Sequence, residues 1–175
     1  RTAAKILINT NHFSYYAALA PESVIPIRDA KIDLNNDGIP DLLGRNVSVV
    51  GIVTAGINTF DNTRLNIYIQ DENAGINVYS TSIDTELYSG YRVKVFGTIS
   101  QNNGMTQITN PIITILNIDD TPPTTITVNA AQLSTQPEKY EDLLIEMLAD
   151  DSGARYNYNN DKIWGIKAKN IEQLF

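Results

Sequence analysis

Hydrophobic and polar residues alternate in several segments between Gly44 and Ile118, and turn-forming residues separate these segments. A period of two is typical of strands that have one buried and one exposed face. The strand candidates are Asn46–Ala55, Leu65–Asp71, Gly75–Ser80, Gly90–Ser100 and Met105–Leu116. The pattern therefore predicts an all-β domain.

Glycines interrupt the first and fourth strand candidates at Gly51 and Gly97. Glycine inside a strand usually marks a bulge or a sharp bend, which lets a short sheet close on itself. The sequence DENAG, Asp71–Gly75, is short enough for a hairpin turn. These features predict a five-stranded Greek-key barrel in which Thr81–Gly90 is the helix or loop that connects the third and fourth strands.

The runs GRNVSVVGIVTAG, IYIQDENAGINVY, LYSGYRVKVFGTIS and GMTQIT occur in this order along the chain. Together they resemble the OB-fold modules of secreted bacterial multidomain proteins, including the modules attached to extracellular nucleases. The resemblance covers less than half of the chain, and it implies an OB-fold barrel in an extracellular or cell-surface protein. It implies no particular task, because OB-fold barrels host many unrelated functions.

A second pattern connects two distant segments, IPIRDAKI (Ile25–Ile32) and ITVNAAQL (Ile126–Leu133). They share the spacing of their apolar residues and one alanine, and each precedes an apolar strand candidate, which indicates an internal repeat. Thr121–Pro123 marks a linker between the two copies. The predicted organisation is an N-terminal arm at 1–24, the OB-fold barrel at 25–118 with a calcium-type loop at 33–41, a linker at 119–125, and an incomplete, β-rich second repeat or subunit-contact segment at 126–175.

Both ends of the chain extend beyond the predicted barrel. The segment at 126–175 is too short for the five strands of the first copy, and an incomplete barrel leaves strand edges unpaired. We therefore expect this segment either to pack on its own barrel or to complete a neighbouring molecule. The arm at 1–24 contains the strand-like run AKILIN, and it either adds a strand to another sheet or lies over its own domain.

The stretch DLNNDGIPDLLG is the clearest candidate for a metal site, because alternate oxygen-bearing residues can converge on one calcium ion. The candidate ligands are Asp33, Asn35, Asp37, Ile39 through its carbonyl oxygen, and Asp41. Gly38 permits the turn, but Gly44 stands where an EF-hand carries a bidentate acid. The sequence predicts a weak, structural calcium site; the alternative is a solvated polar turn.

Strand alternation places one set of aromatic and basic side chains on the outside of the predicted barrel. This set is Tyr68, Tyr79, Arg92, Lys94 and Phe96. OB folds use aromatic and basic side chains to stack single-stranded bases or sugars, so the set is a candidate ligand-binding face. The alternative is that an arm or a neighbouring subunit covers it.

Charge and residue types narrow the function classes. The net charge of -7 argues against a nucleic-acid partner, since it repels phosphate backbones. The absence of cysteine excludes disulfides and thiolate metal sites. His12 is the only histidine, so a zinc site of several histidines is excluded and a Ser-His-Asp triad would need this residue of the arm. We predict no enzyme, and no apolar run is long enough to predict a membrane span.

The leading hypothesis is a non-catalytic, exported structural protein. In this hypothesis the terminal segments assemble the barrel with further copies or neighbouring subunits into a filament, a surface layer or a larger complex. The alternative is an accessory module of a secreted enzyme that binds single-stranded nucleic acid or a glycan.

Overall fold

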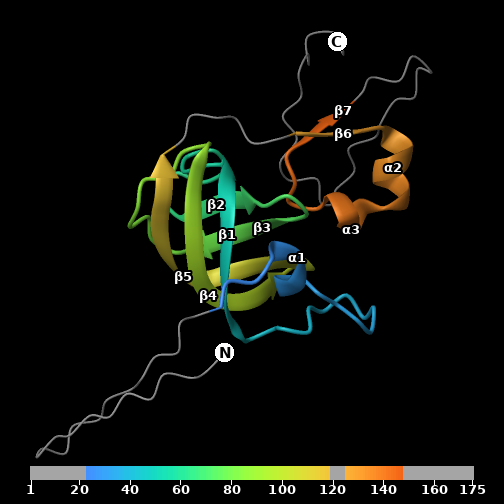
Figure 1. Cartoon of the computed structure of the whole chain (residues 1–175), viewed down its shortest axis with the longest axis horizontal. Coiled ribbons are helices and arrows are strands. Elements are labelled where there is room, and N and C mark those ends of the chain that lie inside the picture. Colours follow the sequence, from blue (N-terminus) through green and yellow to red (C-terminus); the bar gives the residue numbers. More distant parts are fainter. Residues whose placement is uncertain (1–22, 119–124, 148–175) are drawn as a thin grey trace, which may run out of the picture.

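The computed structural model describes residues 23–118 and 125–147. Its main feature is a closed barrel of five strands (Figure 1): β1 (Asn46–Ala55), β2 (Leu65–Gln70), β3 (Gly75–Ser80), β4 (Tyr91–Asn102) and β5 (Met105–Ile118). The order around the barrel is β1-β2-β3-β5-β4, with β3 and β5 parallel and the other barrel pairs antiparallel. This is the strand order of an OB-fold Greek-key barrel, so the predicted fold is confirmed.

The barrel core follows from the alternation of residues along the strands. Val93 and Val95 of β4 and Ile67 and Ile69 of β2 are fully buried, because every second side chain of a strand points to the same face. Burial of each such side chain contributes about 1.5–3 kcal/mol. The strand register is therefore fixed, since a slip by one residue would expose these side chains to water.

Gly97 lies where β4 and β5 change register, between Phe96 and Thr98. A Cβ atom at this position would lie 2.5 Å from Cγ2 of Ile108 and 2.8 Å from the carbonyl oxygen of Thr109, so the close approach requires glycine. In β1 the register shifts between Val53 and Ala55 and not at Gly51. The predicted bend is therefore confirmed in β4, whereas the irregularity in β1 lies further along the strand.

A short helix, α1 (Ile27–Ala30), packs against the barrel core through Ile27 and Ala30. The backbone N–H of Ile27 donates to Oδ2 of Asp71 at 2.8 Å, which ties the helix to the turn between β2 and β3. The connection at 81–90 contains no helix. Its Leu87 is nevertheless fully buried, so this predicted helix or loop is a loop that contributes to the core.

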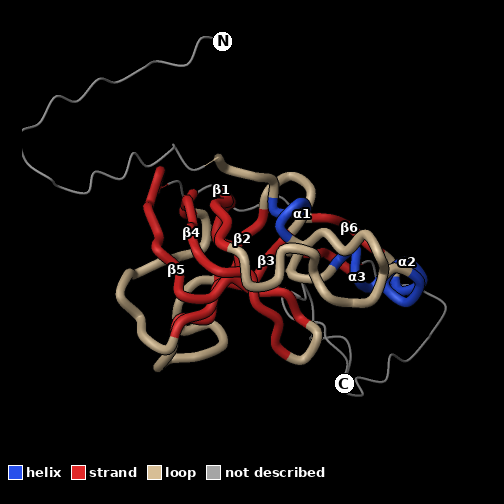
Figure 2. The backbone as a smooth tube through the Cα atoms, turned by 90° about the horizontal axis from the view of Figure 1, so that it is seen from below, coloured by secondary structure: helices blue, strands red, loops and turns tan. Residues whose placement is uncertain are grey.

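The second described range forms a small unit beside the barrel (Figures 1 and 2). Its elements are β6 (Ile126–Val128), α2 (Ala130–Thr135), α3 (Pro137–Tyr140) and β7 (Ile145–Met147), with β6 and β7 parallel. Asn129 and Gln132 form a capping box at the start of α2.

Across the described residues no helix has both the length and the apolarity that a membrane crossing requires.

Polar groups connect the unit at 125–147 with the barrel. Lys31 Nζ lies 2.9 Å from Glu141 Oε2 and 3.0 Å from Asp142 Oδ2, and the backbone N–H of Leu144 donates to Gln70 Oε1 at 2.8 Å. A Cβ atom at Gly75 would overlap the carbonyl oxygen of Asp142, so the two backbones touch. Of the two arrangements expected for this segment, its described part thus packs on its own barrel.

The two segments of the predicted internal repeat follow a similar local path. Val24 forms a parallel bridge with Ser48 of β1, and α1 lies between them in the sequence; likewise β6 pairs in parallel with β7, and α2 and α3 lie between them. Most of the predicted arm at 1–24, most of the linker at 119–125 and residues 148–175 lie outside the described residues. The domain boundaries therefore stay predictions.

Candidate functional site

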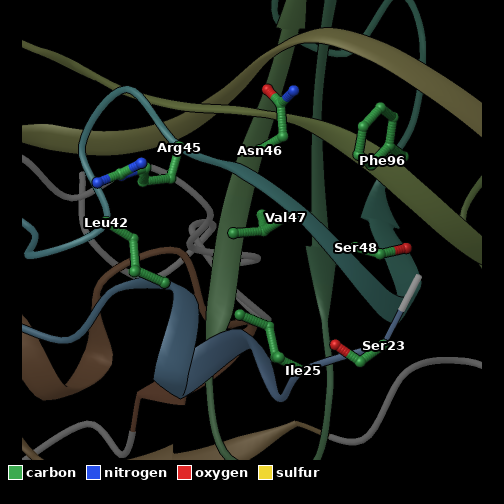
Figure 3. A pocket seen from close by; sticks show the side chains of 8 residues that line it. All are labelled: Ser23, Ile25, Leu42, Arg45, Asn46, Val47, Ser48 and Phe96. Carbon is green, nitrogen blue, oxygen red and sulfur yellow. The ribbon is translucent and has the colours of Figure 1, made fainter. Parts of the chain in front are cut away.

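A groove of about 310 Å³ lies on the outside of the barrel, where the start of β1 pairs with the middle of β4 (Figure 3). Its lining residues are Ser23, Ile25, Leu42, Arg45, Asn46, Val47, Ser48 and Phe96. Ser48 and Phe96 are direct cross-strand neighbours, and Figure 3 shows Ser48 between Phe96 and Ser23, with Arg45 and Leu42 at the opposite end. The groove therefore offers an aromatic wall at one end and a cationic rim at the other.

Ser48 is the unusual polar group of this groove. Its side chain is 3% exposed, and its Oγ atom has no hydrogen-bond partner among the described residues. A buried hydroxyl without a partner costs about 1–3 kcal/mol, and such groups need an explanation in a native structure. The Ser48 hydroxyl is thus a covered polar group in the wall of the groove, and the described residues leave it without a partner.

Phe96 also borders a second hollow, of about 210 Å³, which Lys94, Ile112 and Thr114 complete. The half-buried Phe96 ring thus stands between two depressions. Arg92 and Lys94 follow on the outer face of the same strand. β1, β4 and β5 contain no aspartate or glutamate, so this face is locally cationic although the chain carries a net charge of -7.

A second cluster forms around the loop between β1 and β2. The exposed Phe60 of this loop packs edge-on against Tyr68 of β2, with ring centroids 5.4 Å apart and an interplanar angle of 74°. Tyr68 itself is only 3% exposed, and its hydroxyl lies 3.6 Å from the Met105 sulfur. Burial, and secondarily the nearby carboxylates Asp142 and Glu141, raise the pKa of Tyr68. Its hydroxyl is therefore neutral at physiological pH.

Arg64 ends the same loop in a fixed position. Asp61 accepts hydrogen bonds from the backbone and hydroxyl of Thr63, each at 2.8 Å, and from the backbone and Nε of Arg64 at 3.0 and 2.7 Å. These bonds, first of all that from the Thr63 backbone, lower the pKa of Asp61. The Arg64 guanidinium also donates to the Tyr79 hydroxyl at 3.3 Å and lies 6.0 Å from its ring centroid. It is held in place while 54% of its side chain stays exposed.

The structure divides the predicted ligand-binding set between two faces. Tyr68 and Tyr79 lie on β2 and β3, whereas Arg92, Lys94 and Phe96 lie on β4, whose neighbours are β1 and β5. Alternation predicts which side of a sheet a residue faces, but not which strands are adjacent. Tyr68 is almost fully covered, and the role of this set in ligand binding stays a prediction.

Sequence reasoning missed Phe60 and Arg64 of the loop and Arg45 and Ser48 of the groove. The first two lie in the polar run NTFDNTR, which has no strand periodicity that would give them a face. The one available signal was an aromatic and an arginine in an otherwise polar loop, because binding residues occur disproportionately in loops.

The predicted calcium residues lie together in the exposed loop after α1. Asp33 accepts from the backbone N–H groups of Asp37 at 3.3 Å and Gly38 at 2.8 Å, Asp37 accepts from Ile39 N at 2.9 Å, and Asn35 bonds to Asp37. Asp41 closes the loop by accepting from Leu34 N at 3.3 Å.

Oxygen ligands of the kind that calcium prefers are thus gathered in one loop, although they face backbone donors. No group of three or more His, Cys, Asp and Glu side chains within 23–118 and 125–147 is arranged to hold a metal ion. Calcium binding stays a prediction. His12 lies outside the described residues.

One stretch of the chain is similar to a known enzyme. Over 135 residues the chain is 31% identical to Endonuclease YhcR of Bacillus subtilis (strain 168), and the match covers 73% of this chain. The chain spans only 10% of the length of that relative. No family model matches the sequence.

Several solved structures align with part of this chain. Asparaginyl-tRNA synthetase from Pyrococcus horikoshii, complexed with asparaginyl-adenylate, aligns with a TM-score of 0.45 and 14% identity over 58% of this chain and 24% of that chain. A replication protein A heterotrimer bound to single-stranded DNA aligns with a TM-score of 0.37 and 19% identity over 43% of this chain and 60% of that chain. These likenesses add nothing to what the strand order already shows.

The endonuclease match overturns two expectations from the sequence. The leading hypothesis, a structural subunit that assembles with its neighbours into a filament or surface layer, is wrong, because the similar sequence is part of an endonuclease. The expectation that the net charge makes a nucleic-acid partner unlikely is also wrong, because the similar sequence belongs to an endonuclease. Net charge describes the whole chain, whereas recognition depends on the local charge of a face.

Proposed function

We propose that this chain is a nucleic-acid-binding accessory module of a secreted enzyme of the nuclease type. The observation that carries the proposal is the cluster of Phe60, Arg64 and Tyr79 beside the β1–β2 loop. OB-fold barrels bind oligonucleotides on the face of their second and third strands and on this loop. The similarity to Endonuclease YhcR supports the same class of partner.

The side chains of this cluster suit a single strand. The Phe60 ring is 40% exposed and already rests on Tyr68, so a base can stack on it without a large loss of side-chain freedom. Arg64 is held by Asp61 and Tyr79, and its remaining donors can bind a phosphate oxygen. Stacking accepts any base, since every base has a π face. The module therefore binds single strands with little sequence preference.

The acidic composition limits the affinity of this module. A chain with a net charge of -7 repels each phosphate that approaches it, and this repulsion weakens binding. A few phosphate contacts at Arg64 and neighbouring groups release few counterions. The binding constant should therefore fall only modestly as the salt concentration rises. We expect weak binding that becomes measurable at low salt and gains from attachment to an enzyme that also holds the strand.

The module binds and does not cleave in this proposal. It acts outside the cell, in keeping with the resemblance to modules of secreted proteins, and the loop at 33–41 takes calcium in a structural role. The absence of cleavage, the extracellular location and the structural calcium ion can each be tested independently of nucleic-acid binding. Phe60 and Arg64 belong to a different connecting segment from the loop at 33–41.

The test is fluorescence anisotropy with a labelled oligodeoxythymidylate at low salt. Phe60→Ala is expected to weaken binding by about 1–3 kcal/mol, the range for loss of one stacking platform, and Arg64→Gln is expected to weaken it and lower the salt slope. Arg28→Gln is the matched control, because Arg28 is an exposed arginine on α1 whose side chain is 67% exposed. Absence of binding at low salt, or equal losses for Arg64→Gln and Arg28→Gln, would contradict the proposal.

A further inference from the structure

The groove beside Phe96 has the features of a binding site and is separate from the cluster of Phe60, Arg64 and Tyr79 at the β1–β2 loop. It combines an unpartnered, buried Ser48 hydroxyl, a half-buried aromatic ring and the exposed Arg45 within about 310 Å³. This volume is at the lower end of the range for ligand pockets, about 300–1,000 Å³. The second hollow on the other side of the ring adds Lys94.

The charge of this face indicates the kind of partner. Its three strands carry Arg92 and Lys94 but no carboxylate, and Arg45 stands directly before β1. An anionic partner is therefore favoured. An aromatic ring that stands between two hollows favours planar groups on either side of it, and an anionic chain that carries planar groups is a nucleic-acid strand.

We infer that the Phe96 groove is a second contact for the same single strand, so that a long strand runs along β1 from the β1–β2 loop to Arg45 and Phe96. This inference rests on the proposed function. β1 joins the two sites, because its neighbours are β2 on one side and β4 on the other. The outer residues of β1 between the two sites, Val50, Ile52 and Thr54, carry no charge that would repel phosphate.

The length of β1 sets the length of strand that can reach both sites. From Asn46 to Ala55 an extended strand covers up to about 30 Å at about 3.3 Å per residue. This distance corresponds to roughly nine nucleotides at the 3.4 Å spacing of stacked bases. An oligonucleotide of about five residues can therefore occupy one site only, whereas one of about 20 can occupy both. The span of roughly nine nucleotides lies within the range of site sizes known for OB folds, about 4–16 nucleotides.

The experiment compares oligodeoxythymidylates of about 5 and about 20 nucleotides on the full chain. Phe96→Ala is expected to weaken binding of the long probe at least about fivefold and to leave the short probe, bound at the loop, within about twofold. Phe60→Ala is expected to weaken binding of both probes. Arg45→Gln, with Arg28→Gln as the charge-matched control, repeats the test without removing a half-buried ring, and it should lower the salt slope for the long probe alone.

The outcomes separate this inference from the proposed function. If Phe60→Ala weakens both probes while Phe96→Ala and Arg45→Gln change neither, the second contact is refuted and the proposed function stands. If the unmodified chain binds neither probe, the proposed function fails and the inference fails with it. If inorganic polyphosphate displaces the long probe equally well from the unmodified chain and from Phe96→Ala, the face attracts charge only, and the stacking role assigned to Phe96 is refuted.

Discussion

The barrel and the unit at 125–147 begin with similar sequences but bury their residues differently. In the barrel, α1 places Ile27 and Ala30 in a core of fifteen fully or nearly fully buried residues. In the second unit, α2 buries no residue, and the core consists of Val128, Tyr140, Leu143 and Ile145. The same local pattern thus yields a self-sufficient core only where five strands close around it.

This difference also determines what holds each region. Apolar packing holds the barrel, whereas a buried ion cluster, the hydrogen bond from Leu144 to Gln70 and the backbone contact at Gly75 attach the second unit to it. Asp142 is 1% exposed in its side chain, and its Oδ1 atom has no hydrogen-bond partner among the described residues. Burial, only partly offset by Lys31, raises the pKa of Asp142 to about 6. The second unit should therefore respond to charge and pH, and the barrel should not.

A change in the barrel core acts on the larger of the two regions. Ile67→Ala removes a fully buried side chain, so it should lower the free energy of unfolding by about 2–5 kcal/mol. Urea denaturation measures this quantity. Ile112→Ala is the control, because Ile112 is 65% exposed and should change stability by less than about 0.5 kcal/mol. Equal losses for the two variants would show that the barrel is not held by this core.

The next effect concerns the ion cluster. Lys31→Met leaves Glu141 and Asp142 facing each other without their cation, and removal of one partner from a buried cluster costs about 3–5 kcal/mol. The small unit cannot supply this energy from its own core, so it should detach while the barrel stays folded. Limited proteolysis should then cut within 125–147 and spare 23–118. If the protease instead cut both regions at the same rate, the expectation that the unit at 125–147 detaches from a folded barrel would be contradicted.

The pH dependence of attachment should follow Asp142. Its pKa rises from 3.8 to about 6 in the attached state, so this state binds the proton more tightly, and attachment is strongest below about pH 3.8 and weakens as pH rises through about 6. The change is at most roughly 3 kcal/mol. The change in attachment can be measured by hydrogen exchange of the Leu144 amide, because this amide donates to Gln70 across the contact. Asp142→Asn should remove most of the dependence; an unchanged profile in that variant would assign the effect to another group.

A smaller effect is expected at the loop 33–41, which has no counterpart in the unit at 125–147. If the loop at 33–41 binds calcium with a Kd of about 10⁻⁴–10⁻³ M, then calcium at ten times the Kd should stabilise the protein by about 1.4 kcal/mol. Differential scanning calorimetry should show this as a rise in Tm that Asp37→Ala abolishes. The same Tm with calcium and with a chelator in the unmodified chain would reduce the loop to a polar turn.

The alternation in YRVKVF was sufficient to predict a strand with Val93 and Val95 in the core, because side-chain burial has the same period as the strand. It could not show that Phe96 and Tyr68 lie on different faces, since strand order depends on contacts between distant segments. For the same reason Lys31 and Asp142, 111 positions apart, gave no signal in the sequence. Phe60 and Arg64 belong to a loop, where periodicity carries no information.

The most direct test of nucleic-acid binding is an NMR titration of the full chain with an oligodeoxythymidylate at low salt. The largest amide shift changes are expected in the β1–β2 loop, at Phe60 and Arg64, and at Tyr79 of β3. Shift changes confined to the unit at 125–147, or no changes at all, would contradict this expectation.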